Sequence, residues 1–328
     1  VLDNGQTQIA FVICDNIGIG REIYDQARRL IAKETNLPPA NILMAATHTH
    51  SATRASSDKY QPRLVRGIAD AVRRAVDHLA PAIIGWGGVD EPSEVFNRRW
   101  RLNDPELLKN PFGGVDKVRS NPPRGDALVE PAGPVDPEIF FVSVRAPDGR
   151  PIALLANYSL HYVAGSRPAD VSADYFGVFA NRIGELLGAK SGEAPFVGML
   201  SNGTSGDVNN INRRKQAESY PRYEKMNEVA ERLARRVKEA HDRIEYRDWV
   251  LLGSAHRELK LKVRKPDAQM RQYFAEILGR PAGAQQYHPA ERTYAGRVQR
   301  LLEGPDEITI PLQAVRIGDI VIAAIPFE

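Results

Sequence analysis

Short apolar runs alternate along this chain with segments that carry one apolar helical face. Strands are expected at residues 9–14, 42–46, 82–86, 139–145, 152–158, 196–200 and 250–263. Helices are expected at residues 21–36, 62–80, 174–187 and 220–245, with shorter ones within 266–302. Hairpin signals occur at Asp148-Gly149 and within 307–325. Together these patterns predict an α/β (α+β) fold, in which a mixed β-sheet core is flanked by helices.

Charge and hydropathy exclude some classes of protein. The chain has 44 Lys+Arg against 41 Asp+Glu, a net charge of +3, which argues against a dedicated nucleic-acid binder. Its apolar runs are shorter than the roughly 18 residues that a membrane-spanning helix needs. The 328 residues suggest two domains or one large one.

Both ends of the chain have the pattern of a strand. Val1-Leu2 precedes an Asp-Asn-Gly turn, and residues 320–328 form an apolar run that ends at Glu328. Since a buried strand at a terminus would leave an edge unpaired, we expect the sequence to be an excerpt trimmed at both ends. The compartment therefore stays unknown from the sequence itself.

Histidines follow two of the predicted strands. Cys14 is the single cysteine, so any metal must be held by carboxylates and the seven histidines. His48 and His50 would point to the same side of an extended backbone, and His161 follows the run 152–158. Two histidines and a carboxylate are a common catalytic zinc set. The alternative interpretation is a hydrogen-bonded pair in a polar turn. No motif supports a functional role for the remaining histidines, His78, His241, His256 and His288.

Two further segments are candidates for the site. The loop 201–207 follows a strand, and its Gly203 and Gly206 could bring backbone N–H groups to a ligand oxygen, as in an oxyanion hole. Asp207 could orient a histidine, although an ordinary loop explains the composition equally well. The irregular stretch 91–137 contains Arg98, which could bind an oxyanion or carboxylate. Because ligands collect beyond the carboxyl ends of strands, we expect the active site there.

Six short segments, in order, resemble those of a known family. They are Thr47 to Ser51, Asn97-Arg98, Asn157 to His161, Ser172 to Gly177, Asn202 to Val208 and Ile325 to Glu328. The sequence resembles the neutral/alkaline, non-lysosomal ceramidase family, whose members hydrolyse the amide bond of N-acyl sphingosines with zinc. The resemblance implies that residues 1–328 are the N-terminal catalytic domain, truncated at both ends.

The resemblance also implies roles for individual residues. The metal ligands for Zn²⁺ would be His48, His161 and Glu328, and a tyrosine ligand would lie beyond residue 328. His50 would point at the substrate carbonyl or its oxyanion, with Arg98 supporting it. Asp207 and Ser205 belong to the segment that leads into the family's amidase motif.

One position departs from the family's pattern. The family's proposed nucleophilic serine follows Gly-Asp-Val, whereas here Asn209 follows Val208. An amide cannot act as that serine would, so the departure favours water activated by zinc over a serine acyl-enzyme. Asn209 could instead donate a hydrogen bond. Ceramide itself is placed in doubt as the substrate.

These observations lead to one main hypothesis and two alternatives. We expect a zinc-dependent amidohydrolase that cleaves an N-acyl amide bond of a ceramide-like lipid. The alternatives are a zinc hydrolase of another amide or ester, and a non-catalytic relative that binds lipid or glycan. The expected partner is a small-molecule N-acyl lipid or related amide, with peripheral membrane-surface contact and without nucleic acid. The resemblance suggests a secreted or periplasmic protein.

Overall fold

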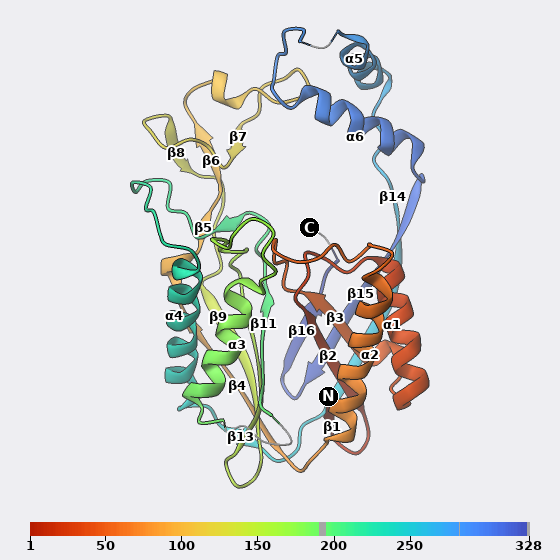
Figure 1. Ribbon diagram of the computed structural model, residues 1–328, viewed down its shortest axis with the longest axis vertical. Helices are drawn as coiled ribbons and strands as arrows, with labels where there is room; N and C mark the ends of the chain where they lie inside the picture. Colours follow the sequence, from red (N-terminus) through yellow and green to blue (C-terminus); the bar gives the residue numbers. More distant parts are fainter. Residues whose placement is uncertain (190–194, 282, 327–328) are drawn as a thin grey trace.

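The computed structural model describes residues 1–189, 195–281 and 283–326. Its main body has four layers, with a pair of helices on each outside and two packed layers of β-sheet between them (Figure 1). The predicted α/β class, with a mixed sheet flanked by helices, is therefore confirmed.

The first half of the body is built on parallel strands β2 (Gln8–Cys14) and β3 (Ile42–Ala46), with β1 (Leu2–Asp3) antiparallel at the edge. Helices α1 (Arg21–Thr35) and α2 (Gln61–Asp77) cover one face. Alternation along β2 explains this packing, because Ala10 and Val12 face the helices whereas Ile9 and Phe11 face the second sheet.

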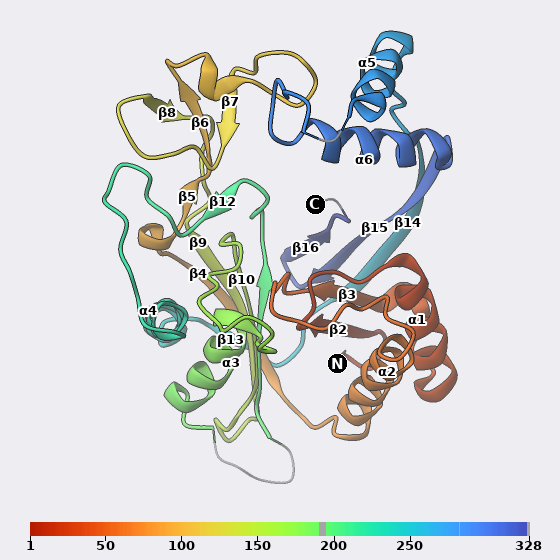
Figure 2. The ribbon, with the colours of Figure 1, turned by 45° about the horizontal axis from the view of Figure 1, so that its top comes forward.

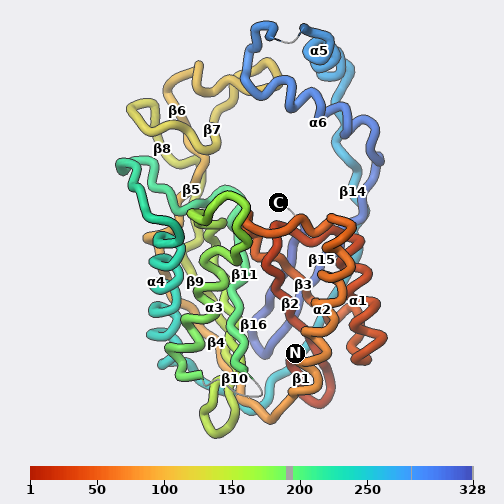
Figure 3. The backbone as a smooth tube through the Cα atoms, in the orientation of Figure 1, coloured from red at the N-terminus to blue at the C-terminus, as the bar shows by residue number. Residues whose placement is uncertain are grey.

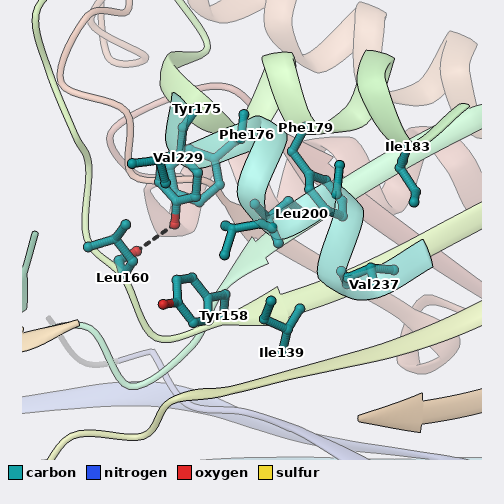
Figure 4. Packing of buried hydrophobic residues seen from close by; sticks show 14 of the residues in the cluster. Ile139, Tyr158, Leu160, Tyr175, Phe176, Phe179, Ile183, Leu200, Val229 and Val237 are labelled. Atoms are coloured by element: carbon teal, nitrogen blue, oxygen red, sulfur yellow. Dashed lines mark hydrogen bonds between the residues drawn. The ribbon is translucent and has the colours of Figure 1, made fainter. Parts of the chain in front are cut away.

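The second half is a five-stranded sheet in the order β11-β10-β9-β4-β13. Its strands are β4 (Ile83–Asp90), β9 (Glu138–Arg145), β10 (Pro151–Tyr158), β11 (Val197–Asn202) and β13 (Tyr246–Arg247). Strands β10 and β11 are parallel, and the other neighbours are antiparallel. Helices α3 (Asp174–Leu186) and α4 (Glu224–His241) bury their apolar faces on this sheet (Figure 4).

A third sheet joins the two halves. Strands β14 (Leu252–Lys262), β15 (Glu307–Ile317) and β16 (Ile320–Ala324) pair antiparallel in sequence order. Val315 and Ile317 pack with Ile9, Leu43 and Val142, so one apolar cluster connects all three sheets. The faces of the sheets that contact this apolar cluster are therefore buried.

Two projections rise from one end of the body and meet (Figures 2 and 3). One contains β5 (Phe96–Asn97), β6 (Arg99–Leu102), β7 (Val118–Ser120) and β8 (Leu128–Pro131), and β12 (Val208–Asn209) pairs with β5. The other contains α5 (Ala268–Gly279) and α6 (Glu291–Glu303). The Phe112 ring lies 5.6 Å from Phe274 and 5.4 Å from Tyr294, centroid to centroid, which joins the projections.

The structure refines several boundaries predicted from sequence. The stretch 91–137 contains short strands and 3-10 turns, which the weak periodicity did not reveal. The helix expected over 62–80 ends at Asp77, and the one expected over 220–245 spans Glu224–His241 after Tyr223, whose φ is 64°. Within the described residues, no helix combines the length and apolar character needed to cross a membrane.

Candidate metal centre

The carboxyl ends of β3, β10 and β11 meet at one edge of the body. His48 and His50 follow β3, and His161 follows β10. Strand β11 runs parallel to β10 and contacts β3, and the Asn202 side-chain amide donates to the Thr47 carbonyl at 3.2 Å. Sheet topology therefore places His161 next to His48 and His50, which lie far earlier in the sequence.

These three histidines form a compact cluster. One ring nitrogen of each lies within 4.8 Å of the others, so the set has a spacing compatible with one metal ion. The ring centroids of His48 and His161 are 4.7 Å apart, and the Nε2 atoms of His48 and His50 are 3.3 Å apart. His161 is buried, His48 is half-buried and His50 is exposed, so the cluster is open on the His50 side.

Backbone carbonyls select the tautomer of the two inner histidines. His48 Nδ1 lies 2.6 Å from the Ile17 carbonyl oxygen, and His161 Nδ1 lies 3.0 Å from that of Ser205. Because a carbonyl only accepts, each Nδ1–H donates, and each Nε2 keeps its lone pair. A histidine that binds a metal through one ring nitrogen typically donates its other ring N–H to a carbonyl or carboxylate in this way. The three histidines therefore form a donor set that could hold a metal ion.

Burial also keeps His161 neutral. Removal from water is the largest cause, and electrostatic interactions with His48, Arg98 and His50 add to it, so that the pKa of His161 falls from 6.5 to about 4 despite the Ser205 carbonyl. At neutral pH its imidazole is unprotonated, the form that can bind a metal.

The metal-free protein is expected to lose stability as the pH falls from 6.5 to about 4. In this range His161 binds its proton more readily in the unfolded chain, so acid favours unfolding, and the stability gained above pH 6.5 is lost. The shift corresponds to roughly 3 kcal/mol. Urea unfolding at several pH values should show a flatter dependence for His161→Gln than for the unchanged protein. Parallel curves would contradict this assignment.

The backbone around His48 differs from the extended strand assumed in the sequence analysis. His48 has a φ of 65°, in the left-handed region that side chains other than glycine rarely adopt. Hydrogen bonds hold this turn, since Thr49 Oγ1 donates to the Ser172 carbonyl at 2.8 Å and the Ser172 N–H donates to the Ser51 carbonyl at 2.8 Å. The proximity of His48 and His50 thus depends on a tethered turn, and the expected strand geometry is wrong here.

Asp174 holds the loop that follows His161. Its buried carboxylate accepts the N–H groups of Val163 at 3.0 Å, Ala164 at 2.8 Å and Tyr175 at 2.7 Å. The hydroxyl of the next residue, Tyr175, donates to the Leu160 carbonyl at 2.8 Å (Figure 4). Sequence reasoning gave Asp174 no role; its only signal was its position in the Ser172–Gly177 segment. Residues 172–175 thus connect both histidine loops.

Arg98 and Asp207 belong to neighbouring segments of one small sheet. Val208 of β12 pairs with Asn97 of β5, the Arg98 N–H donates to the Asp207 carbonyl at 2.7 Å, and the Arg98 guanidinium donates to the Gly206 carbonyl. The Asp207 carboxylate accepts from the Asn97 side-chain amide at 3.2 Å. The partner that orients His161 is therefore the Ser205 carbonyl, in place of the carboxylate that we expected at Asp207.

In the loop 201–207, the N–H groups of residues 203–205 do not form the expected oxyanion hole. Gly203 N donates to the Tyr158 carbonyl, Ser205 N to that of Gly203, and Thr204 N to the Ser159 hydroxyl. These donors are already used inside the protein. The Ser205 residue is buried and contributes its carbonyl to His161.

Two further residues predicted from the sequence are Asn209 and Glu328. The Asn209 side-chain amide donates to Asn121 Oδ1 at 3.0 Å, and its Oδ1 accepts from the Ile211 N–H at 3.1 Å. It therefore fixes the start of the next loop. Glu328, expected as a metal ligand, lies outside the described residues.

Comparisons with solved structures agree with this architecture. The fold is similar to the neutral ceramidase from Pseudomonas aeruginosa, with a TM-score of 0.64 and 16% identity over 95% of this chain and 53% of that chain. It is also similar to a ceramidase complexed with C2, with a TM-score of 0.61 and 15% identity over 95% of this chain and 54% of that chain. The chain thus spans about half the length of each. No protein-family model and no curated protein matches the sequence. At these identities the likeness establishes a shared fold.

Proposed function

We propose that this protein is a zinc-dependent hydrolase of N-acyl amide bonds, related to the neutral ceramidases. The observation that carries the proposal is the cluster of His48, His50 and His161 at the strand ends. The fold shared with two ceramidases and the six resembling segments support it independently.

His48 and His161 would hold the metal through their Nε2 atoms, because their Nδ1 atoms are already bonded to carbonyls. The resemblance adds Glu328 as a third ligand. Zinc in such a site lowers the pKa of its water to about 7 and polarises a carbonyl. The chain supplies a buried, neutral imidazole and an open side on which a substrate can approach.

His50 and Arg98 would act on the substrate. The His50 ring stacks on Tyr162 with centroids 3.8 Å apart, which fixes its plane at the exposed side of the cluster. Arg98 is bound to the Gly206 carbonyl, and its charge is among those that act on His161. A histidine N–H and a nearby guanidinium would stabilise negative charge that develops on an amide oxygen.

Water is the proposed nucleophile. Asn209 stands at the family's serine position and contacts Asn121, while Ser205 is buried beside His161. Removing metal with a chelator should therefore abolish amide hydrolysis, and added zinc should restore it. Ser205→Ala and Asn209→Ala should each keep activity within about tenfold, since neither side chain takes part in the chemical step.

The measurement is turnover of a panel of N-acyl amides and esters, together with zinc content by elemental analysis. Loss of activity in either variant at unchanged zinc content would indicate a side-chain nucleophile or donor and contradict the water mechanism. Esters hydrolysed in preference to every amide would favour the alternative of a different hydrolase on the same fold. Binding of the substrates without turnover, with or without zinc, would favour a non-catalytic relative.

A further inference from the structure

A pocket of about 530 Å³ lies directly beside His50. Its walls come from the turn 50–53 after β3 and from the loop 164–171 after His161. Both segments adjoin the histidine cluster, so a molecule bound with its amide at the histidines would place a neighbouring group in this pocket. The volume is within the range of small-molecule sites.

Hydrogen bonds hold both walls. Ser51 Oγ and Ser166 Oγ lie 2.8 Å apart and join the two segments, and the Tyr223 N–H donates to the Gly165 carbonyl at 3.1 Å. The Tyr223 hydroxyl donates to Asp170, which lines the pocket. Ala164 is fixed by Asp174 at 2.8 Å. The pocket is thus built from tied segments.

The lining mixes small apolar residues (alanine, glycine, proline and valine) with polar ones, namely His50, three hydroxyl side chains, Arg167 and Asp170. Val171 is the largest aliphatic side chain among them, and it is 79% exposed, so it forms little of an apolar wall. A long alkyl chain needs extended apolar surface to be stabilised, whereas hydroxyls and a carboxylate suit hydrogen-bond donors.

Asp170 is the acceptor that would recognise such a donor. The Tyr223 hydroxyl, the Arg167 N–H and the charges of Arg167 and Arg222 hold the pKa of the Asp170 carboxyl below its usual range. The carboxylate is therefore ionised at neutral pH. The Tyr223 hydroxyl and the Arg167 N–H both donate to the Oδ2 atom of Asp170.

We propose that this pocket binds a compact substrate group that carries hydroxyl or amino donors, and that Asp170 determines this specificity. The inference rests on the proposed amide hydrolysis and names its substrate class. The preferred substrate is an N-acyl amide of a small polar amine, in which a long sphingoid chain adds little affinity at this position.

Two matched substrates test the proposal on the zinc-loaded full chain. N-Acetyl-2-aminopropane-1,3-diol is the polar group of N-acetylsphingosine without its chain. With N-acetylsphingosine kept below its aggregation concentration, kcat/KM for the compact diol should be at least about tenfold higher than kcat/KM for N-acetylsphingosine. A higher value for N-acetylsphingosine overturns the inference while leaving amide hydrolysis intact.

The Asp170→Asn variant tests whether Asp170 determines this specificity. Its KM for the diol should rise about tenfold with kcat and zinc content little changed, because one charged hydrogen bond is weakened in binding. N-Ethylacetamide, which lacks hydroxyls, should be insensitive to this change. The exposed Asp77, at the end of α2, provides the control variant Asp77→Asn. Equal effects on both substrates would show a merely structural role and overturn the assignment of Asp170.

Absence of turnover with every amide would instead contradict the proposed function. Calorimetric titration of the zinc-loaded protein with the diol amide then tests, without turnover, whether the pocket binds this group. Binding that Asp170→Asn weakens about tenfold would support the pocket assignment, and absence of binding would overturn it.

Discussion

Replacing His161 with alanine is expected to remove the bound metal and to lower amide hydrolysis by more than about a hundredfold. Changes to residues that only orient a ligand cost about ten- to a hundredfold, so loss of a ligand should exceed that range. His161 is the most buried of the three histidines, and the Ser205 carbonyl fixes its tautomer with Nε2 available for the metal. Elemental analysis of zinc per chain and turnover of an N-acyl amide measure the two effects.

The control is His78→Ala, which changes an exposed histidine at the end of α2. It should keep both zinc and activity. Circular dichroism of the His161→Ala protein distinguishes loss of the site from loss of the fold. A folded His161→Ala variant that binds zinc with unchanged stoichiometry and affinity would eliminate His161 as a ligand.

Replacing Asp174 with alanine is expected to lower the free energy of unfolding by at least about 3 kcal/mol, because three backbone N–H groups lose a buried acceptor. Those donors belong to Val163, Ala164 and Tyr175, in the loop after His161 and the first turn of α3. Urea unfolding measures the effect. An alanine variant that unfolds at the same urea concentration, with the same slope, would show that the carboxylate is not needed to hold the loop.

The Asp174→Asn variant separates charge from backbone strain. Asp174 has a φ of 56°, a conformation that asparagine also tolerates, so this variant changes the carboxylate and preserves the backbone preference. We expect zinc affinity to fall ten- to a hundredfold, as for other residues that position a ligand. The exposed Asp126 offers a matched Asp126→Asn control, which should leave affinity unchanged.

Local patterns predicted the body of the fold well. The apolar face over residues 21–36 corresponds to α1 at Arg21–Thr35, and the run 42–46 is β3 without change of bounds. Such elements are predictable because burial of one face repeats at the period of the element. The stretch 91–137 was not predictable, because its strands are short and one of them, β5, pairs with the distant β12 through Asn97 and Val208.

The candidate site could be predicted from local sequence patterns only in part. The polar clusters after three strands indicated where His48 and His161 would lie, since strand ends collect ligands. The roles of Asp174 and Asp170 depend on loops that fold back over the site, and no local period marks such contacts. Asp207, chosen for its sequence neighbours, contacts Asn97 because β5 and β12 pair.

The alternation of strands and helices and the presence of histidines at strand ends follow from side-chain patterns within a few residues, so both were predictable from the sequence. The folded chain sets the distances between His48, His50 and His161, brings the carbonyls of Ile17 and Ser205 to the two inner rings, and forms the pocket beside His50. These features depend on where backbone atoms from separate loops meet. Backbone carbonyls are present at every residue, so their positions carry no signal until the chain has folded.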